Sequence, residues 1–279
     1  TYLYLRFETS QAATREISIR ARKRLFETFD AERLAICAYA LIIAFVFVGP
    51  IVSMLLASVT NGGDVTFRYY ELLVARRDAV VGTRPDLAIR NSLVFAFGTL
   101  VLAVPMGVVI SLVTARDTRV ARLVGTFAMV PFAVSGIVVG LGLLQTVVFG
   151  IDLFGYRLRV TGAVAIVAAH AVSAYPFVVR TVAPALSTMD DRLVESARAL
   201  GASRTRALVD IELPLAMPAV AAGAAFAFAI SIGEFSSTVV LIEGGDAYTM
   251  PVAVERYLAD RTLGPATAIG TVLLLVTTL

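Results

Sequence analysis

The sequence has little of the chemistry that builds disulfide frameworks and metal centres. It contains one cysteine, Cys37, and one histidine, His170, and each lies in an apolar run. A lone cysteine cannot close an internal disulfide, and one cysteine with one histidine is too few for a Cys/His zinc cluster. We therefore predict no disulfide scaffold, no metal site and no cofactor.

Two further absences narrow the function. No stretch matches G-x-x-x-x-G-K-[ST], the glycine-rich loop whose backbone amides cradle phosphates, so the chain itself is not expected to hydrolyse ATP. The net charge is only +3, which does not indicate a nucleic-acid partner. Residues 1–33 carry charges throughout and lack the apolar core of a signal peptide.

Apolar residues are abundant and come in long blocks. They make up 58% of the chain, and the mean hydropathy is +0.83, which is too apolar for a soluble domain. Continuous apolar runs separated by charged stretches indicate that lipid is the solvent. Only helices can then satisfy the backbone, since the runs are too long for barrel strands. The sequence predicts an all-α polytopic membrane helix bundle.

Five runs are long enough to cross a bilayer, and a sixth is shorter. The full spans are predicted at 34–59, 92–113, 123–149, 162–182 and 215–242. The sixth begins at Ala266 and reaches only about 21 Å as a helix, against a hydrocarbon core of about 30 Å, so we expect a truncated span.

Basic residues are unevenly distributed over the connections between spans. They are dense in segment 1–33, between the second and third spans, and in the loop 186–214, and sparser in the other connections. The positive-inside rule therefore places segment 1–33 and the loop 186–214 in the cytoplasm. We predict three regions: a cytoplasmic segment 1–33, a first span with an outer loop at 34–90, and the main bundle at 91–279.

The cytoplasmic loop reads as two short helices with a sharp turn between them. Thr188 and Asp191 have the spacing of a capping box at the start of the first helix. Gly201 is placed to end that helix in the left-handed conformation. Ser203 can cap the second helix, which we expect to end by Pro214.

The first of these helices carries an apolar stripe on an otherwise charged surface. Leu193, Ala197 and Leu200 follow one another at steps of four and three residues, which places them on one face. Such a face needs a cover, and a protein partner, the membrane surface and the cytoplasmic ends of the chain's own helices all remain open.

The loop also carries a long motif. It consists of Glu195-x-Ala197-x-x-x-Gly201, then nine residues, then Ile211-x-Leu213-Pro214. This pattern resembles the EAA loop of permeases from binding-protein-dependent ATP-binding cassette (ABC) importers, except that Ser196 replaces an alanine. The resemblance implies a type I ABC importer permease fold, in which the first loop helix couples to a separate ATPase. It implies an orienting role for Glu195 at that interface, and a surface ion pair with Arg192 or Arg198 is the simpler alternative. The implied coupling residues are Glu195, Ala197, Leu200, Gly201, Ile211, Leu213 and Pro214.

A second set of residues extends the resemblance over 91–259. Ser231-Ile-Gly233-Glu234-Phe235 is similar to a motif of the sulfate, molybdate, iron and thiamine branch, and Thr249-Met-Pro251-Val is similar to its iron and thiamine members. The implied function is inward transport of a small solute, with ferric iron or thiamine favoured, by alternating access. The implied partners are ABC ATPase subunits, an extracytoplasmic solute-binding protein, and a second permease half or a second copy of this chain. The implied location is the inner membrane of a prokaryotic cell.

Ionisable residues inside spans are costly and tend to be functional. For Glu234 the alternatives are a place on the pathway and a structural hydrogen bond to a neighbouring helix. For His170 we favour a satisfied helix contact over a transport role. The candidate pathway or gate residues are Ser231, Gly233, Glu234, Phe235 and His170.

Two rival functions share parts of this pattern. A secondary transporter would also be a polytopic bundle, but the sequence shows no inverted repeat and would leave the cytoplasmic helix pair without a role. An intramembrane serine protease would use Ser231 and His170, and Ala229-Ile-Ser231-Ile-Gly233 nearly matches G-x-S-x-G but lacks its first glycine.

Overall fold

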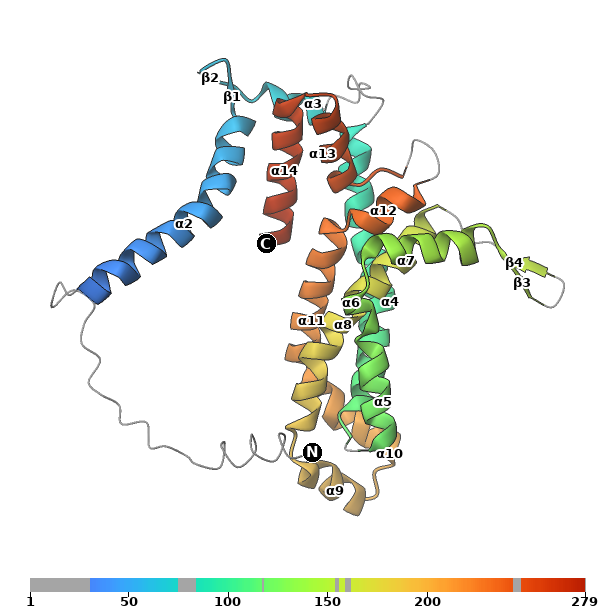
Figure 1. Cartoon of the computed structure of the whole chain (residues 1–279). Coiled ribbons are helices and arrows are strands. Elements are labelled where there is room, and N and C mark those ends of the chain that lie inside the picture. The colour runs from blue at the N-terminus through green and yellow to red at the C-terminus, as the bar shows by residue number, and fades with distance from the viewer. Residues whose placement is uncertain are drawn as a thin grey trace, which may run out of the picture. The chain divides into compact units, whose positions relative to one another are not determined.

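The computed structural model describes residues 31–74, 84–116, 118–153, 156–158, 162–242 and 247–278 (Figure 1). The chain divides into two units, Thr1–Val52 and Ser53–Leu279. The first unit contains most of the first apolar helix, and the second contains all the elements discussed below. Most of the predicted cytoplasmic segment, residues 1–30, lies outside the described residues, so that prediction is not tested.

The described residues are almost entirely helical, as predicted. The helices are α2 (Ala31–Ser58), α3 (Arg68–Val74), α4 (Pro85–Thr114), α5 (Arg119–Ala128), α6 (Val130–Ala133), α7 (Gly136–Leu143), the π-helical turn η1 (Leu144–Val148), α8 (Ala163–Ser187), α9 (Asp191–Ala199), α10 (Arg204–Ala207), the π-helical turn η2 (Leu208–Glu212), α11 (Leu213–Gly233), α12 (Ser236–Leu241), α13 (Met250–Ala259) and α14 (Leu263–Thr278). The strands form two antiparallel hairpins, β1 (Thr60–Asn61) with β2 (Asp64–Val65) and β3 (Ile151–Leu153) with β4 (Tyr156–Leu158).

The apolar helices match the predicted spans in number. Four are long and apolar enough to cross a membrane: Leu34–Ser58, Pro85–Thr114, Ala163–Ser187 and Arg204–Gly233. A bent helix pair supplies a fifth crossing if it is counted as one span, and α14 is a shorter apolar helix. These counts refer to length and composition within the described residues. Five full spans and a shorter sixth were predicted, so the polytopic bundle is confirmed.

The third predicted span is not the straight helix expected over 123–149. Helical segments Arg119–Ala133 and Gly136–Thr146 meet at an angle of 100°. The backbone leaves the helical region at Val134, with φ −96° and ψ 135°, and Pro131 lies in the first turn of the short α6. The missing backbone donor of Pro131 is tolerated in that first turn, and the bend itself falls between Ala133 and Gly136.

The fifth predicted span, 215–242, is also wrong at both ends. The helix runs without a stop from Arg204 to Gly233, and residues 236–241 form the separate helix α12. Pro214 does not end the second loop helix as expected. The π-helical turn η2 inserts an extra residue, with the Leu213 amide bonding to the Leu208 carbonyl, so that Pro214 falls in the first turn of α11 where its missing amide is not needed.

Helices α4, α8 and α11 form the centre of the unit Ser53–Leu279 (Figure 1). Their shared cluster is built largely from small residues, including Ala103, Ala174, Val178 and Ala227, all buried. Small side chains let helices approach closely, which is how helices associate when water does not drive their contact. The centre therefore holds α8 and α11 in fixed register, and both helices carry candidate site residues.

Candidate functional site

The loop helix α9 begins at a different cap from the one predicted. Asp190 is the N-cap, and its carboxylate accepts a hydrogen bond from the Arg192 amide at 3.0 Å. The Thr188 hydroxyl instead donates to the Pro184 carbonyl at the end of α8, so it is engaged away from the start of α9. The capping box of Thr188 and Asp191 is therefore wrong, while the predicted start of the helix holds. An aspartate at this position also complements the helix dipole.

The end of α9 is the glycine turn that the sequence predicts. Gly201 has φ +93°, the left-handed region that other residues avoid. The Gly201 amide donates to the Arg198 carbonyl and the Ala202 amide to the Ala197 carbonyl, both at 3.0 Å. These two bonds form a Schellman motif, which satisfies the last carbonyls of the helix. Ser203 caps the next helix as predicted, by accepting from the Arg206 amide.

The apolar stripe of α9 is exposed. Leu193 is 46% and Leu200 90% exposed, so the ends of the chain's own spans do not cover this face. Glu195 on the same helix is exposed, and no ion pair with Arg192 or Arg198 occurs in the described part of the chain. Of the three possible covers, an external partner or the membrane surface therefore remains.

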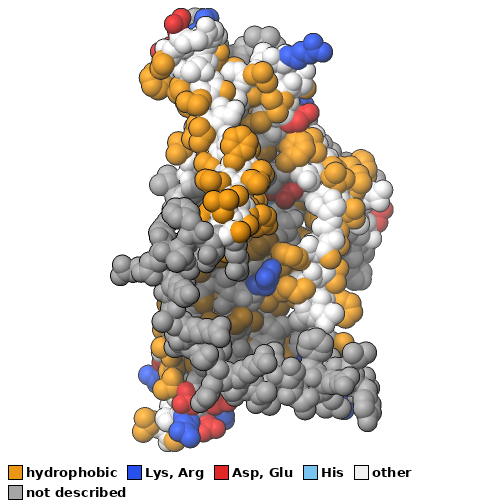
Figure 2. Space-filling view, turned by 60° about the vertical axis from the view of Figure 1, so that its left-hand side comes forward, with side chains coloured by type: hydrophobic (Ala, Val, Ile, Leu, Met, Phe, Trp, Pro, Cys, Tyr) orange, Lys and Arg blue, Asp and Glu red, His pale blue; other side chains and the backbone are white. Residues whose placement is uncertain are grey.

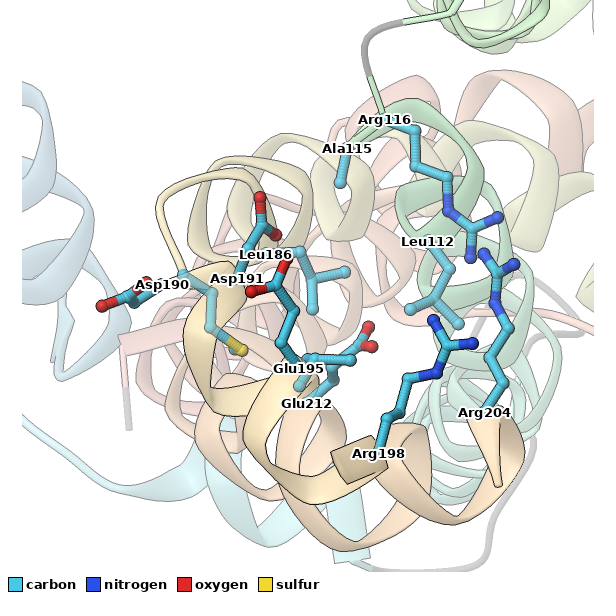
Figure 3. Close-up of a pocket in the computed structure, with 12 residues that line it drawn as sticks. Leu112, Ala115, Arg116, Leu186, Asp190, Asp191, Glu195, Arg198, Arg204 and Glu212 are labelled. Carbon is cyan, nitrogen blue, oxygen red and sulfur yellow. The ribbon is translucent and has the colours of Figure 1, made fainter. Parts of the chain in front are cut away.

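Behind α9 the loop encloses a charged cavity of about 310 Å³ (Figure 3). It lies between α9, the ends of α4 and α8, and the start of the long helix from Arg204. In Figure 3 the guanidinium groups of Arg116, Arg198 and Arg204 occupy one side and the carboxylates of Asp191 and Glu195 the other. A cavity with charged walls thus lies between helix α9 and the ends of the membrane-spanning helices α4 and α8.

The second half of the motif lies on the continuous helix Arg204–Gly233 and comprises Ile211, Leu213 and Pro214. Ile211 is in the π-helical turn and the other two begin α11. A displacement of α9 can therefore reach the centre of the bundle through one helix. Ser231 and Gly233 lie at its far end, so α11 separates the coupling set from the pathway set by about 30 Å. The structure does not bring the two predicted sets together.

Glu234 lies in the break between α11 and α12. Its backbone is extended, and its Oε1 accepts hydrogen bonds from the Ser237 amide at 2.9 Å and the Ser237 hydroxyl at 3.1 Å. The carboxylate thus caps the first turn of α12. A Cβ on Gly136 would lie 2.8 Å from Glu234 Oε1, so the start of α7 packs directly on this cap. Phe235, partly buried, completes the break.

His170 sits at the centre of a buried hydrogen-bond network. Its Nδ1 is 2.9 Å from the Ser231 hydroxyl, and its Nε2 is 2.7 Å from the Thr238 hydroxyl. Ser231 also donates to the Thr99 hydroxyl at 3.0 Å, and Thr238 donates to the Glu234 carbonyl. The network ties α4, α8, α11 and α12 together beside the break. It matches the favoured interpretation of His170 as a satisfied helix contact.

Ser231 and His170, the pair that the serine-protease alternative would use, do share the hydrogen bond of a catalytic dyad. Both side chains are nearly inaccessible, Ser231 at 2% and His170 at 1% exposure. The second ring nitrogen meets a threonine hydroxyl where a serine protease would place a carboxylate. A substrate bond cannot reach this serine without opening the bundle, so the geometry does not support a catalytic dyad.

One residue of interest was missed. Arg180 lies in α8 with its side chain exposed, and its guanidinium carbon is 5.4 Å from the centre of the Phe132 ring. Phe132 belongs to α6, at the break of the third span, and its ring also contacts Phe177. The signal was available, because Arg180 is the one charged residue of the predicted span 162–182.

Comparison with known proteins decides the family. Residues 99–279 match the model of the binding-protein-dependent transport system inner membrane component. The chain belongs to this family. The permease is 30% identical to the molybdenum transport system permease ModB of Haemophilus influenzae, over 61% of this chain and 79% of that protein. It is 33% identical to the molybdate/tungstate permease WtpB of Pyrococcus abyssi (67% and 72%) and 31% to the sulfate permease CysT of Salmonella typhimurium (63% and 65%).

Solved ABC importers share the fold of the permease. A bacterial alginate transporter, in complex with an alginate-bound periplasmic protein, matches with a TM-score of 0.68 at 19% identity, over 88% of this chain and 90% of that one. The inward-facing methionine transporter MetNI matches with a TM-score of 0.54 at 20% identity, over 77% and 93%. At these identities the likeness supports the type I importer fold alone.

Family membership settles the functional class. The permease is a multi-pass inner-membrane transport subunit of an ABC importer, so the secondary transporter and the serine protease are both rejected. The expectation of ferric iron or thiamine is not confirmed, because the relatives named above are permeases for molybdenum, molybdate/tungstate and sulfate.

The geometry at Glu234 leads to a stability prediction. Glu234→Ala removes both bonds to Ser237 and should lower the free energy of unfolding by about 0.5 to 2 kcal/mol, the usual cost of losing a cap. Glu234→Gln keeps an acceptor oxygen and should cost less. Unfolding of the purified permease in detergent measures both, with exposed Glu255→Ala as control. If Glu234→Gln abolishes transport at unchanged stability, the carboxylate acts on the pathway.

Proposed function

We propose that this permease imports a tetrahedral oxyanion, molybdate, tungstate or sulfate. The observation that carries the proposal is that relatives at 30–33% identity from two bacteria and an archaeon are all named for such oxyanions or their metal. The motif Ser231–Phe235, which the sequence comparison left shared between oxyanion, iron and thiamine permeases, is compatible with this cargo. The cargo is a small dianion that a soluble binding protein delivers.

We further propose that α9 is the coupling helix for a separate ATPase. The exposed face of Leu193 and Leu200, fixed by a Schellman turn at Gly201, has the form of a docking surface. Glu195 is exposed at the rim of the cavity behind α9 and has no ion-pair partner among the described residues, so its carboxylate is available to a partner chain. Closure of the ATPase would press on α9 and, through the helix from Arg204, bias the bundle between inward-open and outward-open states.

The test of the cargo is uptake by the reconstituted transporter. The permease is placed in vesicles with its ATPase and binding protein, and uptake of radiolabelled molybdate, tungstate and sulfate is compared with that of thiamine and ferric iron. We expect saturable, ATP-dependent uptake of at least one oxyanion, inhibited by the others in excess. ATP-dependent uptake of thiamine or iron with no oxyanion uptake would overturn the proposal.

A further inference from the structure

Arg180 is a charged residue in an apolar helix, and its surroundings do not neutralise it. It lies about two turns before the end of α8 at Ser187. Within the described residues no carboxylate lies within ion-pairing distance of it, and its recorded contact is the face of Phe132. A guanidinium left in hydrocarbon costs at least about 2.5 to 3.5 kcal/mol. An exposed arginine here therefore faces a water-filled space or another protein chain.

The position of the side chain argues against simple escape to the membrane surface. A snorkelling arginine points along its helix toward the nearer end. Arg180 is instead held over Phe132 of α6, at the 100° break of the third span, and α6 packs beside α8 in the middle part of the bundle (Figure 1). Figure 2 shows one face of the molecule, on which hydrophobic side chains cover much of the described surface between the ends and one basic side chain lies in the middle. The guanidinium thus lies beside the break of the third span, and its N–H groups have no hydrogen-bond partner among the described residues.

We propose that Arg180 lines the translocation pathway and binds the oxyanion in transit. The inference rests on the oxyanion cargo proposed above. The planar guanidinium offers two parallel N–H donors that match two oxygens of a tetrahedral anion. One positive charge against a dianion gives weak binding, which suits a site that must release its cargo. Ser173, partly exposed two turns earlier on the same face of α8, offers a further donor.

Substitutions at Arg180 test the site in the reconstituted transporter, with radiolabelled molybdate, tungstate and sulfate as probes. Arg180→Gln should lower the maximal uptake rate at saturating binding protein by about tenfold or more, and Arg180→Lys by less, because lysine keeps the charge without the fork. The amount of bound ATPase and the binding-protein-stimulated ATP hydrolysis should stay unchanged. Arg256→Gln is the matched control, since Arg256 also stacks on an aromatic ring, that of Tyr248, at 4.4 Å.

Phe132→Leu separates anion binding from ring stacking. It removes the aromatic face and should lower uptake by no more than about threefold, since the guanidinium remains. An effect as large as that of Arg180→Gln would mean that stacking is the role, and would overturn the proposal. So would wild-type uptake by Arg180→Gln, or a parallel loss of bound ATPase, which would indicate a structural contact with another chain.

Water access gives an independent measure. In a Cys37→Ala background, Arg180→Cys should react with a membrane-impermeant thiol reagent faster than Val101→Cys, which is 71% exposed on α4 and apolar in its surroundings. Equal, slow reaction at both positions places Arg180 against lipid and overturns the site even when oxyanion uptake is observed. Absence of any oxyanion uptake by the wild type refutes the cargo, and the oxyanion site with it.

Discussion

Gly201→Val is expected to reduce uptake by this importer by about tenfold or more while the spans stay inserted and folded. Valine in the left-handed region costs about 1 to 2 kcal/mol, so the Schellman turn opens or α9 extends by further residues. Either change moves Leu193 and Leu200 away from the positions that the turn fixes. Nothing lies within 4 Å of a Cβ placed on Gly201, so the effect comes from the backbone and not from a collision.

The control for this prediction is Gly201→Asn. Asparagine tolerates the left-handed conformation far better than valine and is found at helix ends of this type. It should keep most of the uptake and the full ATPase complement on the purified permease. If Gly201→Val also keeps its ATPase and transports normally, α9 is not a coupling element and the proposed mechanism is wrong.

The loop was predictable because its determinants are local. A glycine that must adopt positive φ, a serine that caps the helix after it and an apolar stripe at helical spacing are each set within a few residues. The error at the first cap, Thr188 in place of Asp190, arose because Thr188 bonds to Pro184 of the preceding helix. Both residues are good caps, and the choice depends on where α8 ends.

The breaks in the third and fifth spans were not predictable in the same way. Hydropathy is continuous through both breaks, and the side chains that stabilise them come from distant segments. Glu234 caps α12 while Gly136 of the other broken span packs against it, and His170 and Ser231 meet across 61 residues. The polar residues inside the apolar runs were visible in the sequence, but their hydrogen-bond partners are defined only by the packing of the helices.

Arg180 was missed for a related reason. The predicted span 162–182 contains Arg180 as its one charged residue, but the ring that Arg180 faces, Phe132, belongs to a different predicted span. Helix α8 continues to Ser187 and leaves Arg180 deeper, beside the break in the third span. The sequence shows the charge in the span, but only the packing of α6 against α8 shows what the guanidinium contacts.

His170→Leu is expected to destabilise the permease by about 1 to 3 kcal/mol, since it leaves the buried Ser231 and Thr238 hydroxyls facing an apolar side chain. The triple variant His170→Leu, Ser231→Ala, Thr238→Val removes all three polar groups together. It should recover most of the lost stability, because replacing a whole buried network by apolar groups is close to neutral. Unfolding midpoints in detergent measure both variants.

The triple variant also separates structure from transport at the break of the fifth span. Ser111→Ala is the matched control, since that buried hydroxyl bonds only to Gly107 of its own helix and its loss should change stability little. A neutral imidazole donates through one nitrogen, so at the other nitrogen Ser231 or Thr238 donates to the ring in place of its bond to Thr99 or to the Glu234 carbonyl. If the network only holds α8, α11 and α12 together, the stable triple variant transports oxyanion at close to the wild-type rate. A stable triple variant without uptake would instead assign this network to the transport cycle.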